Sequence, residues 1–245
     1  MSRCLAGTGG PGLAQSSTGG KKMRSTTLPG SSGEHTLQDR YGTESRALAF
    51  YDDQMLDRLN AAMVRFIGRM EMMWVATSDR SGACDSTFRA GPPGFVAVAD
   101  PHSLYWPEYR GNGVLASQGN IVENPHVGLL FLDFFDSTVG LHINGAARLV
   151  DNADLPRGLL AHPAVAAALA APGGRHPERF IGVTVEEAYI HCAKHVPRLV
   201  KHPKTRDWGT DNAVAKGGDF FQAASDARRD GPSTRPAGGG RPREK

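Results

Sequence analysis

Alternating apolar and polar positions along the middle of the chain predict a β-rich domain with flanking helices. Apolar residues recur at spacings of three and four from Leu56 to Met70, which indicates an amphipathic helix beginning after a cap at Asp53. A shorter helix is expected before it, from a cap at Thr43 through Phe50. After Met70 the period changes to two, which is typical of strands. The domain is therefore expected to begin with helices and to continue as a sheet.

Six or seven segments have this strand pattern, and short breaks separate most of them. We expect strands at residues 72–78, 83–88, 95–99, 103–106, 127–134, 138–150 and 188–196. Tight turns, such as the one at residues 79–82, make neighbouring strands antiparallel. This number of antiparallel strands in roughly 120 residues predicts a small barrel. Residues 155–171 are alanine-rich and helical, with an interruption at Pro163.

The stretch of residues 106–133 contains a glycine-broken loop, a helix that begins near Ser117, and an apolar strand. Free N–H groups and the helix dipole at such a helix start favour an anion such as phosphate. Arg110 in the loop can add a two-point contact to that anion. Alternatively, Gly111 and Gly113 only form a turn and Arg110 is solvated. These residues alone leave both interpretations open.

The run of residues 127–132 is apolar at every position, so both faces of this strand need cover. One face can fill the barrel, whereas the other requires a helix or a second subunit. A homodimer is therefore expected.

Composition suits one globular domain with tails, since 40% of the 245 residues are hydrophobic and 22% are charged. Residues 1–33 are rich in Gly, Ser and Thr and are predicted to be a disordered tail. The folded domain is placed at residues 34–205. Residues 206–245 are predicted to be a mostly disordered tail, in which an apolar island at residues 217–221 can dock on the domain.

Charge and cysteine usage exclude several classes of function. The net charge of +3 is too small and too scattered to indicate nucleic-acid binding. No apolar run reaches the ~18 residues of a membrane helix, and the first residues do not resemble a signal peptide. Three cysteines without close spacing argue against a disulfide framework, which fits a reducing cytoplasm best.

No catalytic side chains and no metal site are predicted from the residues. Cys84 has no recognisable base and is expected to pack. His191 and His195, if they lie on one strand, are ~13 Å apart and cannot share an ion.

Three segments together resemble the pyridoxamine 5′-phosphate oxidase-like family of FMN-binding split barrels. They read CDSTFRAGPPGF at residues 84–95, GNIxxNPxVGLLF at 119–131 and IHCxK at 190–194. The resemblance extends over residues from about 40 to 210 and keeps the order of the elements. It implies a mostly β fold with flanking helices, namely a six-stranded antiparallel split β-barrel. It also implies a homodimer that binds FMN in the groove between its subunits.

The resemblance places cofactor contacts on a strand and on the loop and helix that follow. The residues expected along the flavin ring and ribityl chain are Ser86, Thr87, Phe88 and Arg89. Those expected near the phosphate and ribityl hydroxyls are Tyr109, Arg110, Asn112, Ser117 and Asn120. Lys194, on the expected last strand, is a further candidate contact with the cofactor or the substrate. Trp208 is considered as a candidate contact with the cofactor groove.

One departure from the family pattern concerns the phosphate. The family's enzymes of this name carry a Ser-Arg-Lys run where this chain reads Leu115-Ala116-Ser117, so two phosphate-binding cations are absent. Arg89 and Arg110 are the nearest replacements in sequence. Glu108 is assigned no phosphate contact, because its charge would repel a dianion. The resemblance therefore supports FMN binding better than it supports that vitamin as the substrate.

Two classes of function follow from the resemblance. The first is an FMN-dependent oxidoreductase acting on an unknown small molecule, in which the flavin transfers the electrons. The second is a non-catalytic protein of the same fold that binds or stores flavin or haem. A deazaflavin remains a third possible ligand.

Overall fold

The computed structural model describes residues 28–172, 175–204, 206–207, 209–210 and 212–224. The chain divides after Ala49 into two compact units. Helix α1 (Ser32–Arg40) lies in the first unit and begins with a capping box between Ser31 and Glu34. Helix α2 (Glu44–Asp53) runs across the division. Most of the predicted tail of residues 1–33 lies outside the described residues, and the predicted domain boundaries stay predictions.

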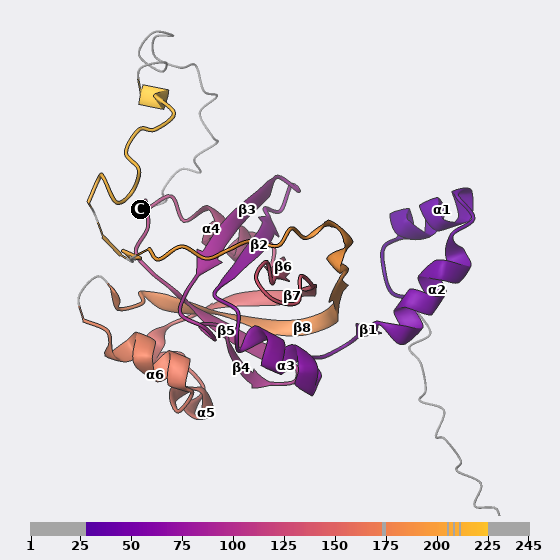
Figure 1. Cartoon of the computed structure of the whole chain (residues 1–245), viewed down its shortest axis with the longest axis horizontal. Coiled ribbons are helices and arrows are strands. Elements are labelled where there is room, and N and C mark those ends of the chain that lie inside the picture. The colour runs from indigo at the N-terminus through magenta and orange to yellow at the C-terminus, as the bar shows by residue number, and fades with distance from the viewer. Residues whose placement is uncertain (1–27, 173–174, 205, 208, 211, 225–245) are drawn as a thin grey trace, which may run out of the picture. The chain divides into compact units, whose positions relative to one another are not determined.

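The second unit is built on one antiparallel sheet (Figure 1). Its strands are β1 (Met55–Leu56), β2 (Met72–Ser78), β3 (Cys84–Ala90), β4 (Ala97–Asp100), β5 (Ser103–Glu108), β6 (His126–Leu132), β7 (Gly140–Val150) and β8 (Arg179–His191). The strand order is β3-β2-β6-β7-β8-β5-β4, and β1 pairs with β8. The sheet does not close on itself, which is the arrangement of a split barrel. The predicted fold class is confirmed, with more strands than the six expected.

Four helices accompany this sheet in the second unit. They are α3 (Ala61–Ile67), α4 (Ala116–Glu123), α5 (Arg157–Leu160) and α6 (Pro163–Ala170). Short 3-10 helices occupy residues Asn152–Asp154 and Ala193–His195. Pro163 begins α6 and thus separates it from α5, as its missing N–H and fixed φ predict. No helix in the described part of the chain is long and apolar enough to cross a membrane.

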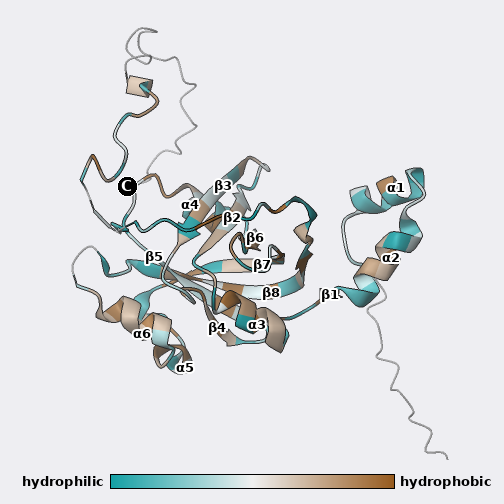
Figure 2. Ribbon diagram, in the orientation of Figure 1, coloured by the Kyte–Doolittle hydropathy of each residue, from teal (hydrophilic) through white to brown (hydrophobic). Residues whose placement is uncertain are grey.

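Two hydrophobic clusters hold this unit together. The larger lies inside the barrel, where Trp106, Phe131 and Ile143 are at most 1% exposed. The smaller lies beneath α5 and α6, where Leu159 and Val165 pack with Phe180. Figure 2 shows hydrophobic colouring along much of α6, which follows from its alanine-rich sequence. The smaller cluster therefore fixes α5 and α6 on the sheet.

The helix predicted to begin at Asp53 begins seven residues later. Asn60 is its actual cap, because its side-chain oxygen accepts from the N–H groups of Ala62 and Met63 at 2.9 and 3.0 Å. Leu56 lies instead in β1, opposite Ala188 of β8. Pairing with β8 therefore outweighs the helical spacing of the apolar residues in this segment.

The last strand was also placed wrongly. Strand β8 covers Arg179–His191, not residues 188–196, and it pairs with both β5 and β7. Its first half is buried on both faces, so it lacks the alternation that marks a half-buried strand. Lys194 consequently lies in a 3-10 helix beyond the sheet. The apolar island at residues 217–221 does not dock, since Phe220 and Phe221 are 79% and 86% exposed.

Candidate functional site

A pocket of about 580 Å³ lies between strand β3, the end of β5 and the start of α4. Strand β3 is an end of the sheet path, and in the described residues it pairs only with β2. Its outer backbone N–H and C=O groups are therefore not used by the sheet. An edge strand beside a pocket can offer these groups to a ligand.

Six of the ten predicted site residues line this pocket: Thr87, Phe88, Arg89, Tyr109, Asn112 and Ser117. The other four are not among its lining residues: Ser86, Arg110, Asn120 and Lys194. Trp208 lies outside the described residues. The structure thus brings together the strand and the loop that the resemblance linked.

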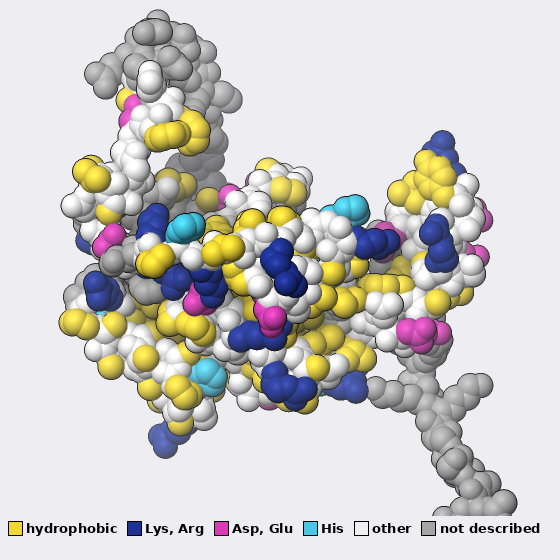
Figure 3. Space-filling model, in the orientation of Figure 1, with side chains coloured by type: hydrophobic (Ala, Val, Ile, Leu, Met, Phe, Trp, Pro, Cys, Tyr) yellow, Lys and Arg dark blue, Asp and Glu magenta, His cyan; other side chains and the backbone are white. Residues whose placement is uncertain are grey.

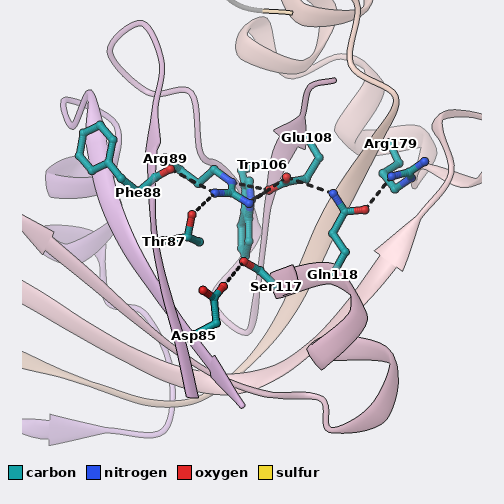
Figure 4. Close-up of polar contacts among 9 residues, drawn as sticks. All are labelled: Asp85, Thr87, Phe88, Arg89, Trp106, Glu108, Ser117, Gln118 and Arg179. Carbon is teal, nitrogen blue, oxygen red and sulfur yellow. Dashed lines mark hydrogen bonds and ion pairs between the residues drawn. The ribbon is translucent and has the colours of Figure 1, made fainter. Parts of the chain in front are cut away.

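Alternation along β3 separates its predicted site residues onto two faces. Thr87 and Arg89 lie opposite the core residues Val75 and Met73 of β2, so they share the inner face. Phe88 points away from them, as Figure 4 shows, and meets Trp74 edge-on at 5.3 Å between ring centroids. Half of the Phe88 surface remains exposed. Arg89 is therefore directed toward the pocket, and Phe88 toward the outer face of the sheet.

Glu108, at the end of β5, is the polar centre of the pocket wall and is only 5% exposed. Arg89 donates to both carboxylate oxygens, from Nε at 2.7 Å and from Nη2 at 3.0 Å. Trp106 Nε1 donates at 2.7 Å, and Gln118 Nε2 donates at 3.3 Å. Figure 4 shows the three donors converging on this carboxylate. Burial of a carboxylate is costly, and these donors offset that cost.

The same hydrogen bonds fix the start of α4 against the sheet. Gln118 Oε1 accepts from Arg179 Nη1 of β8 at 2.6 Å, so Gln118 connects Arg179 with Glu108. Ser117 Oγ donates to Asp85 of β3 at 2.7 Å (Figure 4). One turn later, Asn120 donates to Thr77 Oγ1 of β2 at 3.0 Å. The start of the helix is thus positioned by side chains from four strands.

Sequence reasoning missed the roles of Glu108 and Gln118. Glu108 was set aside because a carboxylate repels phosphate, yet its charge is paired with Arg89. The signal available in sequence was an acid two positions after Trp106, on the same face of the strand as Leu104 and Trp106. That position suggested burial, but its partner 19 residues away could not be chosen from sequence.

The N-terminus of α4 opens onto the same pocket. Leu115 precedes the helix in the left-handed conformation, with φ at 56°, and makes no side-chain cap hydrogen bond. Gly113, with φ at 81°, helps turn the chain into this start. Residues 113–118 all line the pocket. Since the first N–H groups of a helix have no partner within it, this end is suited to an anion.

The charges of the described lining residues do not by themselves suit a dianion. Arg89 is their one cation, whereas Asp85 and Glu108 are carboxylates, so their formal sum is −1. Arg110 is directed elsewhere, with Nη2 donating to the carbonyl oxygen of Gly209 at 3.1 Å. Burial raises the pKa of the Tyr109 hydroxyl above its usual value, so it stays neutral at pH 7.

A family model described as pyridoxamine 5′-phosphate oxidase matches residues 59–192, more than half of the chain. HupZ from Group A Streptococcus is similar in structure, with 16% identity, a TM-score of 0.41, and coverage of 58% of this chain and 100% of HupZ. A putative pyridoxamine 5′-phosphate oxidase from Lactobacillus delbrueckii has 19% identity, a TM-score of 0.39, and coverage of 56% of this chain and 98% of that protein.

HutZ, a haem storage protein from Vibrio cholerae, has 15% identity, a TM-score of 0.37, and coverage of 53% of this chain and 89% of HutZ. At these identities and TM-scores the structural matches carry no inference about function. No curated protein matches this chain.

Proposed function

Since the chain belongs to the pyridoxamine 5′-phosphate oxidase family, we propose that it is an FMN-binding flavoprotein. The observation that supports this most is the pocket between the edge strand β3 and the uncapped N-terminus of α4. Its volume of about 580 Å³ lies within the roughly 300–1,000 Å³ typical of small-molecule sites. The pocket thus offers both a strand edge for a polar ring and a helix start for a phosphate.

We place the flavin ring along β3. The outer backbone groups of this edge strand can pair with the N–H and C=O groups of the ring. Thr87 and Arg89 border the same space, and Arg89 is held in place by its two-point contact with Glu108. A fixed guanidinium orients a ligand better than a mobile one, because less side-chain entropy is lost on binding. Glu108 is accordingly a positioning residue for Arg89.

We place the phosphate at the N–H groups of Ala116, Ser117 and Gln118, where the helix dipole favours negative charge. The formal charge of −1 on the pocket wall leaves the phosphate without a full cation partner. Arg110, in the adjacent loop, supplies one partner in this proposal, after release of its contact with Gly209. The proposal takes the remaining positive charge from a second copy of the chain.

A homodimer is the assembly we propose. Apolar side chains on the outer face of neighbouring strands support it: Trp74 and Leu130 are only half-buried, and Phe88 is half-exposed. The inner face of β6 is at most 5% exposed at Val127 and Phe131, so the barrel already covers that face. A second copy would cover the outer face. Light scattering that shows a monomer holding a full complement of flavin would overturn this assembly.

The proposed activity is an oxidoreduction of a small molecule. Bound FMN supplies the electron-transfer chemistry, while the chain binds the cofactor, orients it and excludes water. Anaerobic addition of NADH or NADPH to the flavin-loaded protein should bleach its visible absorbance. Storage would be indicated by a flavin that stays oxidised with both donors. Such a flavin would also fail to complete a cycle of photoreduction and reoxidation by oxygen.

Titration of apoprotein with FMN and with riboflavin tests the cofactor and the phosphate contact. Arg110→Ala should weaken FMN by about 1.5–3 kcal/mol, the contribution of a charge-assisted hydrogen bond. Riboflavin, which lacks the phosphate, should respond little. Arg157→Ala, on α5 and away from the pocket, is the matched control.

Equal weakening of both ligands would make Arg110 a structural residue. If the wild type binds neither ligand, the flavin assignment fails, and titrations with haem and with a deazaflavin follow.

A further inference from the structure

A second pocket, of about 640 Å³, lies between the end of α3, the loop of residues 92–96 and helix α6; we call it the α6 pocket. Figure 3 shows hydrophobic side chains in the region of α6, with Lys and Arg side chains around them. No local pattern predicts this pocket, because its walls come from segments about 70 residues apart. Its volume lies within the range typical of small-molecule sites.

The small side chains of α6 explain why this space is not filled. Four alanines at spacings of three and four face the pocket: Ala164, Ala167, Ala168 and Ala171. Each contributes only a methyl group. Val165, the large residue between them, is 2% exposed and packs into the cluster beneath the helix instead. Helix α6 is therefore anchored by one face and leaves the neighbouring face open.

The opposite wall is fixed by its backbone. Gly94 has φ at +74°, and a Cβ there would lie 2.9 Å from the carbonyl oxygen of Gly68 at the end of α3. Its N–H donates to the carbonyl of Met70 at 3.1 Å. Arg206 Nη1 donates to the carbonyl of Gly91 at 3.0 Å. This close packing forms the wall before any ligand arrives. Binding therefore costs little conformational entropy in this wall.

The charges on the α6 pocket are of one sign. Arg175 and Arg206 are the charged residues of its described lining, which includes no carboxylate. Glu71 lies behind Arg206 at 3.4 Å but is also paired with Lys201 at 3.0 Å. One carboxylate thus faces two cations there. His162, the remaining titratable group beside Tyr109, accepts from the N–H of Ala164 as the cap of α6.

The α6 pocket adjoins the proposed cofactor pocket. Phe95, Pro107 and Tyr109 line both of them. A ligand in the α6 pocket would therefore lie across one layer of side chains from a flavin on β3. Such a ligand would not touch the flavin, but it would alter the surroundings of the ring through these shared side chains.

We propose that the α6 pocket is a second ligand site beside the cofactor pocket and that it takes an apolar carboxylic acid in its anionic form. The apolar body lies against the alanine face of α6, and the carboxylate is met by Arg175 and Arg206. Only the effect of this ligand on the flavin rests on the proposed function. The pocket and its ligand class are independent of the flavin.

Calorimetric titration of the full-length apoprotein with 2-naphthoate and with its neutral amide tests the ligand class. The wild type should bind the carboxylate about tenfold more tightly than the amide, as one charge-assisted contact implies. Arg175→Gln should remove most of that preference. Equal affinity for the two compounds in the wild type would overturn the assignment of an anionic ligand.

A matched pair of α6 variants tests the location. Ala167 lines the pocket, whereas Ala166 does not, and both side chains are exposed. Ala167→Trp fills the space and should weaken naphthoate at least about tenfold, while Ala166→Trp should leave it unchanged. Equal weakening by both variants would overturn the location. A tenfold gain in affinity from Phe220→Ser with Phe221→Ser would overturn it too, because the chain's own tail would then be the occupant.

Naphthoate added to the FMN-loaded protein tests the adjacency. It should shift the visible spectrum of the flavin in the wild type and not in Ala167→Trp. An unchanged spectrum at saturating naphthoate would overturn the adjacency of the two sites. If the wild type binds no flavin, the proposed function fails, whereas the apoprotein titrations still decide whether the α6 pocket binds a carboxylate.

Discussion

The carboxylates of Asp133 and Glu108 are almost equally buried, at 4% and 5% exposure, but they are held in different ways. Asp133 accepts from the N–H groups of Phe135, Asp136 and Ser137, within its own hairpin. Ser137 Oγ adds a donor at 2.7 Å. Arg69 adds another at 3.1 Å, but its side chain is 48% exposed. Asp133 thus depends mainly on local backbone and has a structural role in the turn.

Glu108 instead depends on side chains from three elements. Arg89 belongs to β3, Trp106 to its own strand β5, and Gln118 to α4. Arg89 and Gln118 line the pocket in which we place the cofactor, whereas Asp133 is no part of its lining. The difference teaches that burial alone does not mark a functional acid. An acid that is held by side chains from several elements beside a pocket connects those elements. A change in the position of one element can therefore move the others.

Removal of the Glu108 carboxylate should have the largest effect. Glu108→Ala leaves the partly buried Arg89 and the indole N–H of Trp106 without their acceptor, so the free energy of unfolding should fall by about 3 kcal/mol. Denaturant titration measures this loss. The double variant Arg89→Met with Glu108→Leu should recover most of it, because no unpaired charge remains. A loss below about 1 kcal/mol in Glu108→Ala would show that water replaces the carboxylate as the acceptor of these donors.

Asp133→Asn should cost less and should leave flavin binding intact. Burial raises the pKa of Asp133, but the hydrogen bonds from Ser137, Phe135 and Asp136 outweigh it and lower the pKa from 3.8 to about 2. This difference corresponds to about 2 kcal/mol of stability at neutral pH. Denaturant titration at pH 7 measures it. A weaker affinity for FMN in this variant would show that Asp133, like Glu108, influences the cofactor site.

The same pKa sets the pH range in which Asp133 matters. Its folded-state pKa is depressed, so its contribution is complete above about pH 4 and is lost as the pH falls toward 2. The stability difference between the wild type and Asp133→Asn should therefore shrink across this range. Unfolding curves at several acidic pH values measure the shrinkage. A difference that stays constant down to pH 2 would contradict the low pKa.

Gln118→Ala should have the smallest effect on stability, about 1 kcal/mol for a buried side-chain hydrogen bond. Because Gln118 connects Arg179 with Glu108 at the start of α4, FMN should also bind several-fold more weakly. Asn124→Ala is the matched control, since Asn124 donates to Ser78 at 2.9 Å outside the pocket. It should lose similar stability and keep its affinity for FMN. Equal affinities for FMN in the two variants would show that Gln118 does not contribute to the cofactor site.

Local patterns were sufficient for much of the fold. Alternation placed β2 at residues 72–78, in agreement with the structure, and Pro163 separated two helices as expected. The resemblance read from three segments identified the split barrel and the family. Such features depend on residues close in sequence, whose spacing directly reflects the period of the strand or helix.

Contacts between distant segments were decided only by the tertiary structure. The sequence made Arg89 a candidate phosphate ligand and excluded Glu108, whereas the barrel pairs the two. The α6 pocket likewise exists only because residues 92–96 are folded opposite the alanines of α6. Sequence spacing specifies which face of an element a residue occupies. Strand register and helix packing then determine which faces meet, and both depend on the whole barrel.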